Sequence, residues 1–175
     1  MRTKKAVLGG FLIATVISTG WCWIGKGKIF DNWESRNTKF GIKITAYEEG
    51  GWVGGARYLF EAAPVGSVDW REIMLFRHDD PVPIPHNQVY FVSDHVGYCF
   101  MGWMYAVTTD SGTHWSVWNA ERDLPNWKCC NYVLIREVDV APDGTGVMKL
   151  NFIPERPGEV PELYTNDYGQ HWASQ

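Results

Sequence analysis

The fold is decided by two eight-residue segments, Thr108-Thr109-Asp110-Ser111-Gly112-Thr113-His114-Trp115 and Thr165-Asn166-Asp167-Tyr168-Gly169-Gln170-His171-Trp172. Both have the pattern Thr-x-Asp-x-Gly-x-His-Trp. This pattern is typical of a hairpin turn that is stabilised by its own side chains. Asp accepts hydrogen bonds from backbone N–H groups, Gly adopts positive φ, and the apolar Trp side chain folds back and packs against the hairpin. We therefore expect Asp110 and Asp167 to be structural acceptors.

The repeated segment resembles the Asp-box, or BNR-type, repeat found in sialidases and in the photosystem-assembly type of β-propeller. The resemblance covers residues 88–172, and more weakly residues 40–87. It implies an all-β fold of antiparallel, blade-like sheets built from Asp-box hairpins. The residues that carry it, and to which it gives a structural role, are Thr108, Asp110, Gly112, Trp115, Thr165, Asp167, Gly169 and Trp172.

The sequence before each box repeats the same order of strands and turns. In the unit formed by residues 88–118, we expect strands at 88–93, 98–101, 103–108 and 116–118. In the unit formed by residues 132–172, we expect strands at 132–140, 147–152 and 163–164, with an insertion at 153–162. The two boxes therefore belong to two larger and related units.

Residues 40–87 are expected to form a third, degenerate unit. Strands are predicted at 40–47, 52–55 and 56–61, with a helical turn near 68–75. The segment 64–70 keeps Gly66 and Trp70 but has Ala where the Asp belongs. Residues 26–39 are expected to be a linker that precedes a β domain at 40–175.

Three such units are too few for a closed ring, because propellers typically have 4 to 8 blades. We therefore expect an open or partial propeller. Its sheet edges need cover from another chain, from packing of one sheet on another, or from the proline-rich segment 79–85.

The N-terminus has the order of an export signal, with Arg2, Lys4 and Lys5 followed by the uncharged segment 6–25. This segment is long enough to span a hydrocarbon core of about 30 Å. We favour a retained signal anchor over residues 1–25, with residues 26–175 on the periplasmic side of the cytoplasmic membrane. The alternative is a signal peptide cleaved near Gly20, which would release the protein to the periplasm.

Four cysteines are present, and Cys22 lies in the expected anchor. The other three, Cys99, Cys129 and Cys130, lie in the exported domain, where a disulfide persists. We expect Cys99 to pair with Cys129 or Cys130. A strained bond between the adjacent Cys129 and Cys130 is the alternative.

The polar clusters do not combine into a recognisable catalytic or metal-binding motif. The segment 77–80 is explained by a solvated loop, and 139–144 by a hairpin turn that lacks the oxygen pattern of an EF-hand. The chain is too short for the six-bladed sialidase scaffold, and its arginines lack that family's local motifs. The net charge of −4 disfavours nucleic acid as a partner. We expect no enzymatic activity, no cofactor and no metal.

We expect instead a non-enzymatic, membrane-anchored module that binds another protein. Asp-box proteins without glycosidase residues often serve as assembly factors or accessory subunits of membrane complexes, and the resemblance implies that role here. The loop 119–131 is the favoured recognition loop, with Arg122, Asn126 and Trp127 as candidate partner-binding residues. The alternatives are a periplasmic immunity or inhibitor protein that neutralises an exported toxin enzyme, and a carbohydrate-binding or glycosidase-like protein.

Overall fold

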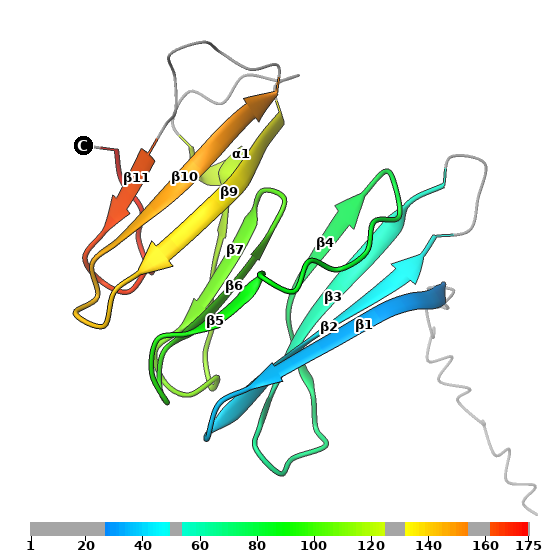
Figure 1. The fold of residues 1–175 in the computed structure, drawn as a ribbon, viewed down its shortest axis with the longest axis horizontal. Helices are drawn as coiled ribbons and strands as arrows, with labels where there is room; N and C mark the ends of the chain where they lie inside the picture. Colours follow the sequence, from blue (N-terminus) through cyan, green and yellow to red (C-terminus); the bar gives the residue numbers. More distant parts are fainter. Residues whose placement is uncertain (1–26, 50–53, 125–131, 154–161, 175) are drawn as a thin grey trace, which may run out of the picture.

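The computed structural model describes residues 27–49, 54–124, 132–153 and 162–174. Within these residues the chain is mostly β-structure, arranged as three antiparallel sheets that do not close into a ring (Figure 1). The all-β prediction and the expectation of an open arrangement are confirmed. No helix among the described residues is long and apolar enough to cross a membrane. The expected anchor at 6–25 lies outside them.

Each sheet is a meander in which every strand pairs with its neighbours along the chain. The first sheet consists of β1 (Lys28–Arg36), β2 (Phe40–Glu48), β3 (Ala56–Pro64) and β4 (Arg71–His78). The second sheet consists of β5 (Val89–Phe91), β6 (Gly97–Met101), β7 (Met104–Thr108) and β8 (Ser116–Asn119), and the single helical turn α1 (Ala120–Asp123) follows it. The third sheet consists of β9 (Tyr132–Val140), β10 (Gly146–Ile153) and β11 (Glu162–Thr165). A bridge between Tyr164 and Ala173 starts a fourth strand there.

The second and third units match the predicted strands closely, whereas the first unit requires three corrections. The expected linker at 26–39 contains β1, so the first sheet has four strands. The predicted helical turn near 68–75 is wrong, because this stretch leads into β4. Of the strand predicted at 52–55, Gly54 and Gly55 are not in a strand, and residues 52–53 lie outside the described part of the chain.

The three sheets are stacked face to face in a row, with one apolar core at each junction. The core between the first and second sheets contains Phe40, Ile42, Ile44, Tyr58 and Phe76. The core between the second and third sheets contains Tyr98, Phe100, Tyr105, Ile135 and Met148. All five residues of β6 are buried, as expected for a strand covered on both faces.

The proline-rich segment between the first two sheets lies against the edge strand β1. The Ile84 backbone N–H donates to the Asp31 carboxylate at 2.8 Å, and the buried Tyr58 hydroxyl donates to the Val82 carbonyl at 2.7 Å. The His86 ring stacks on Trp33, with the ring centres 5.6 Å apart. This part of the first sheet's edge is therefore covered within the chain, as the prolines indicated.

Cys99 lies in the core between the first and second sheets and is a free thiol with no exposed surface. Burial raises its pKa well above the ordinary value, so it is held as the neutral thiol. Cys99 is therefore not in a disulfide, contrary to the expected pairing with Cys129 or Cys130. Cys129 and Cys130 lie outside the described residues.

Candidate functional site

The two boxes form loops with the same hydrogen-bond network. We call residues 109–115 and 166–172 the box loops. In the first, the Thr108 hydroxyl donates to Asp110 at 2.9 Å and accepts the Gly112 N–H at 3.0 Å. Asp110 also accepts the His114 backbone N–H at 2.9 Å, and its second oxygen lies 2.6 Å from His114 Nδ1.

The second box loop repeats these contacts. The Thr165 hydroxyl donates to Asp167 at 2.7 Å and accepts the Gly169 N–H at 2.9 Å. Asp167 accepts the His171 backbone N–H at 3.1 Å and lies 2.6 Å from its Nδ1. Each carboxylate is therefore committed to holding its loop, which is the structural role expected of Asp110 and Asp167.

The box carboxylates have lowered pKa values. Burial raises the pKa of Asp110, but the bonds from the backbone and ring of His114 and from the Thr108 hydroxyl outweigh it and lower that pKa. Burial likewise opposes the bonds from His171 and Thr165, which lower the pKa of Asp167. A carboxyl group with a lowered pKa in the folded state stabilises the fold above its unfolded pKa, and this contribution is lost as pH falls through the folded pKa.

Replacement of both carboxylates, as Asp110→Asn with Asp167→Asn, should flatten the acid limb of the stability profile. We expect the free energy of unfolding at neutral pH to fall by about 1–3 kcal/mol, because each amide keeps one acceptor but loses the charge-assisted bond. Below pH ~4, where free Asp protonates, the wild type should lose stability more steeply than the variant. Urea unfolding at a series of pH values measures both effects, and parallel acid limbs would contradict this assignment.

A third loop, between β3 and β4, is related to the box loops. We call residues 65–70 the Gly66 loop. Its Val65 N–H donates to the Lys39 carbonyl at 2.8 Å, as the Ser111 N–H does to His95 and the Tyr168 N–H does to Gly144, both at 2.9 Å. Gly66 has φ +83°, and the box glycines have φ +83° and +87°. The first unit therefore keeps the anchoring bond and the glycine of the other two, but its turn differs, because Ser111 and Tyr168 have positive φ and Val65 does not.

The Gly66 loop corrects one detail of the sequence interpretation. Its Pro64 carbonyl accepts the Ser67 N–H at 3.0 Å, and the carbonyls of Asp110 and Asp167 accept the equivalent bonds at 3.4 Å. Pro64, and not an Ala, therefore occupies the position of the Asp. A proline offers no carboxylate, so this loop lacks the side-chain network and rests on its backbone bonds.

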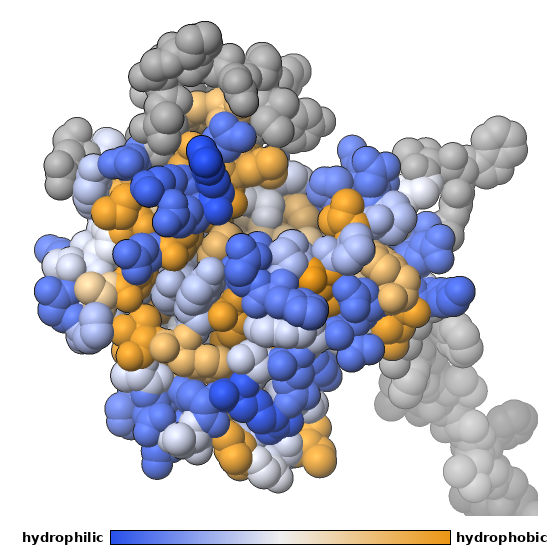
Figure 2. Space-filling view, in the orientation of Figure 1, coloured by the Kyte–Doolittle hydropathy of each residue, from blue (hydrophilic) through white to orange (hydrophobic). Residues whose placement is uncertain are grey.

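All three loops lie on the same side of the molecule, at the ends of the strands, together with the connections between the first and second strands of each sheet (Figure 1). We call this the loop-end surface. The His114 and His171 side chains are 85% and 89% exposed on it. In the Gly66 loop, Val65 is 49% exposed and Val68 is 86% exposed. Figure 2 shows apolar atoms at the bottom of the molecule, where the β3–β4 connection lies in Figure 1.

One Ser–His pair also lies on this surface, with Ser111 Oγ 2.7 Å from His95 Nδ1. Ser111 has a positive φ of 60°, which could suggest a strained nucleophile. Tyr168 occupies the same position of the second box loop and has φ 63°. The backbone conformation therefore belongs to the repeated turn, and it gives no reason to assign Ser111 a nucleophilic role.

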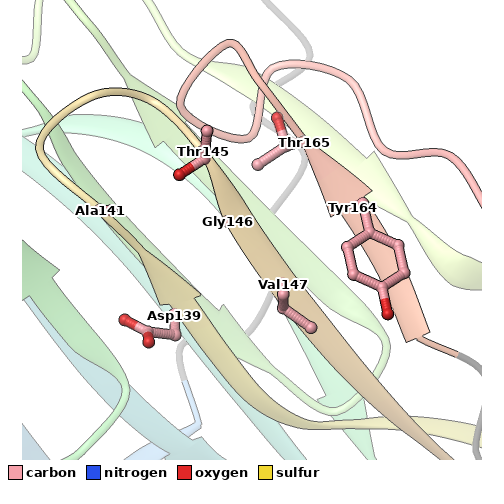
Figure 3. A pocket seen from close by; sticks show the side chains of 7 residues that line it. All are labelled: Asp139, Ala141, Thr145, Gly146, Val147, Tyr164 and Thr165. Atoms are coloured by element: carbon pink, nitrogen blue, oxygen red, sulfur yellow. The ribbon is translucent and has the colours of Figure 1, made fainter.

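A shallow hollow of about 360 Å³ lies on the outer face of the third sheet (Figure 3). Its walls come from the ends of β9, β10 and β11. The lining residues are Asp139, Ala141, Thr145, Gly146, Val147, Tyr164 and Thr165. Beside it the Tyr164 hydroxyl donates to Glu162 at 2.7 Å, and the Lys149 ammonium donates to Glu137 at 3.0 Å.

An aromatic and basic cluster lies on the outer face of the first sheet, which is the face of the three-sheet row farthest from the hollow. The Trp70 ring lies between two cations, with the Lys43 ammonium 4.5 Å and the Arg36 guanidinium 5.0 Å from its centre. Glu61 pairs with Lys43 at 2.9 Å, and Glu34 pairs with Arg36. Sequence analysis missed this cluster because Arg36 stands in the segment expected to be a linker.

The partner-binding residues predicted from the sequence are described only in part. Arg122 lies on the single turn α1, where its guanidinium donates to Asp123 at 2.6 Å and to the Val117 carbonyl at 3.1 Å. These contacts tie α1 to β8. Asn126 and Trp127 lie outside the described residues. Among the described residues, no group of three or more His, Cys, Asp or Glu side chains is placed to hold a metal ion.

Comparison with known proteins returned no matching family model, no matching curated protein and no matching solved structure.

Proposed function

We propose that this chain is a non-enzymatic protein-binding module and an accessory or assembly subunit of a membrane protein complex. In this proposal residues 6–25 anchor it in the cytoplasmic membrane, and the three sheets lie on the periplasmic side. The observation that carries it is the loop-end surface, where three related loops present exposed side chains from a fixed scaffold. The resemblance of the box segments to Asp-box repeats supports the same reading, since such proteins without glycosidase residues often assemble membrane complexes.

The apolar tip of the Gly66 loop is the expected centre of the partner-binding interface. Val68 occupies the position that His114 and His171 hold in the box loops, where each histidine contacts its aspartate. Val68 is 86% exposed, about as much as the two histidines, but its side chain is apolar. Buried apolar side chains at the centre of an interface contribute much of the binding energy. Val68 and Val65 together offer such a centre.

The start of β1 gives this surface an orientation. Lys28 begins β1 only three residues after the proposed anchor ends at Gly25. The nine residues of β1 extend by about 30 Å, and they lead from the anchor to Asn37 beside the loop-end surface. The loop-end surface therefore faces away from the membrane, where another subunit reaches it.

The test is affinity purification of the full-length chain from detergent-solubilised membranes of its native host, with intact-mass analysis of the recovered chain. We expect an uncut chain together with stoichiometric membrane subunits. Val68→Asp should lose these subunits, because it places a charge at the centre of the interface. Asn87→Asp adds the same charge at an exposed position of the segment between the first two sheets and serves as the matched control.

Two results would overturn the proposal. A chain that begins at Trp21 and is recovered only from the soluble fraction would remove the anchor, and an exported enzyme bound to it would favour the inhibitor alternative. Retention of the same subunits by Val68→Asp would exclude the loop-end surface as their binding site.

A further inference from the structure

The two junctions between sheets follow one packing rule. At the first junction, Phe40 of the first sheet packs against Trp115 of the next unit's box loop, with ring centres 6.2 Å apart. At the second junction, Tyr105 of the second sheet packs against Trp172 of the next box loop at 5.5 Å. The Trp of each loop therefore covers the face of the preceding sheet.

The face that receives the next unit is identified by equivalent residues of the second strands. Ile42, Tyr98 and Val147 each lie three residues after the carbonyl that accepts the loop N–H bond, at Lys39, His95 and Gly144. Ile42 and Tyr98 are buried in the two junctions. Val147 instead lines the hollow of the third sheet, beside Asp139 and Tyr164 (Figure 3). The hollow is therefore the receiving face of the third sheet, with no further sheet of this chain's described residues on it.

The outer face of the first sheet, at the opposite end of the row of sheets, carries the Trp that would fit a receiving face. Trp70 ends the Gly66 loop four residues after its glycine, whereas Trp115 and Trp172 follow theirs by three, and it is the nearest counterpart of those two Trp residues. Since no sheet of the described residues precedes the first one, Trp70 lies on the outer face and is held between Arg36 and Lys43. The chain therefore has a receiving face at one end and a donating Trp at the other.

We infer that two copies of this chain associate head to tail, with Trp70 of each copy placed in the hollow of the other. The charges near the two elements favour this contact. The receiving face carries three acidic side chains, Asp139, Glu137 and Glu162, and two bases, Lys149 and the neighbouring Arg136. Trp70 brings Arg36 and Lys43 with it, and although each is paired with a glutamate of its own sheet, both cations lie at the ring that would enter the hollow beside Asp139.

The number of sheets allows this association to close. Two copies contribute six sheets, within the 4 to 8 of closed β-propellers. The two-fold axis of such a ring runs along the ring axis, so both copies present Lys28 on the same side. Both could then be anchored in one membrane. The end faces are more polar than the two internal junctions, so the association is expected to be reversible and weakened by salt.

The loop-end surface stays free in this ring. His114 and His171 remain 85% and 89% exposed although their loops are packed in the two internal junctions. Val68 holds the same position of the Gly66 loop and should remain exposed as well. The inference therefore stands independently of the partner proposed above, and the two can fail separately.

The test is sedimentation velocity of the full-length chain in detergent micelles at low and high ionic strength. We expect the wild type to form dimers at low ionic strength and to dissociate at high ionic strength. Asp139→Arg and Arg36→Glu should each weaken dimerisation about tenfold or more, because each places like charges in both junctions. An equimolar mixture of the two variants should dimerise again, since both of its junctions then pair opposite charges.

The mixing step makes the assignment specific, because a variant that has merely unfolded would not dimerise again when mixed. Circular dichroism identifies such an unfolded variant. Val68→Asp should dimerise like the wild type, which separates this association from binding of the membrane subunits. A wild-type chain that remains monomeric at low ionic strength would overturn the inference. So would dimers that persist in both single variants, or two folded variants that fail to associate when mixed.

Discussion

Gly169→Ala should be one of the most destabilising single substitutions in this chain, with a loss of about 3 kcal/mol in the free energy of unfolding. Two causes combine. Gly169 has φ +87°, a conformation that costs a residue with a side chain about 1 kcal/mol or more. An added Cβ would also overlap the Tyr105 hydroxyl and lie 3.0 Å from the Trp172 ring. Tyr105 is fully buried, so the overlap adds about 1–3 kcal/mol of overpacking.

The repeat supplies the matched control. Gly66 has nearly the same φ, +83°, but an added Cβ there would meet no atom within 4 Å. Gly66→Ala should therefore cost only the backbone term, about 1 kcal/mol. Gly112→Ala should fall between the two, because its Cβ would approach the Phe40 ring at 3.0 Å.

Urea unfolding of the three variants measures this order. Addition of Tyr105→Phe to Gly169→Ala should recover part of the loss, since it removes the hydroxyl that the Cβ meets. Equal losses at Gly66 and Gly169 would show that packing against Tyr105 contributes nothing to this glycine's role.

The strands of the second and third units could be predicted because a self-contained signal ends each unit. Thr, Asp, Gly and Trp of a box lie within eight residues, and their bonds close locally, as Thr108 and Asp110 illustrate. Short apolar runs then extend the prediction backward into β6 and β7, and more alternating patterns extend it into β9 and β10. The strands β9 and β10 are joined by a short turn and pair with each other directly across it.

The first sheet was harder to predict because its strands are defined by contacts distant in sequence. β1 has charges at Lys28, Asp31, Glu34 and Arg36, which is typical of an edge strand but equally of a linker. Its place is fixed by pairing with β2 and by the bond from Ile84 to Asp31. The outer-face cluster around Trp70 has the same origin, because it joins side chains from β1, β2 and the Gly66 loop. No local pattern contains all three.

Phe40→Ala should loosen the junction between the first and second sheets and lower the free energy of unfolding by about 3–5 kcal/mol. Phe40 is fully buried and packs edge-on against Phe91 at 5.2 Å and against Trp115 at 6.2 Å. Gly97 and Gly112 bring backbone close to the same ring. Because backbone forms part of this wall, the site cannot collapse easily around the smaller side chain, and a cavity remains.

The location of Phe40 also predicts which part of the molecule opens. It joins the first sheet to the second and belongs to neither the core nor the contacts of the third sheet. Hydrogen exchange should therefore accelerate most in β2 and β3, while β9 and β10 retain more of their protection. Leu75→Ala is the control, since Leu75 is 38% exposed on the outer face of the same sheet and should cost less than ~1 kcal/mol. Uniform acceleration across all three sheets would mean that the stack unfolds as one cooperative unit and that Phe40 does not hold a separable junction.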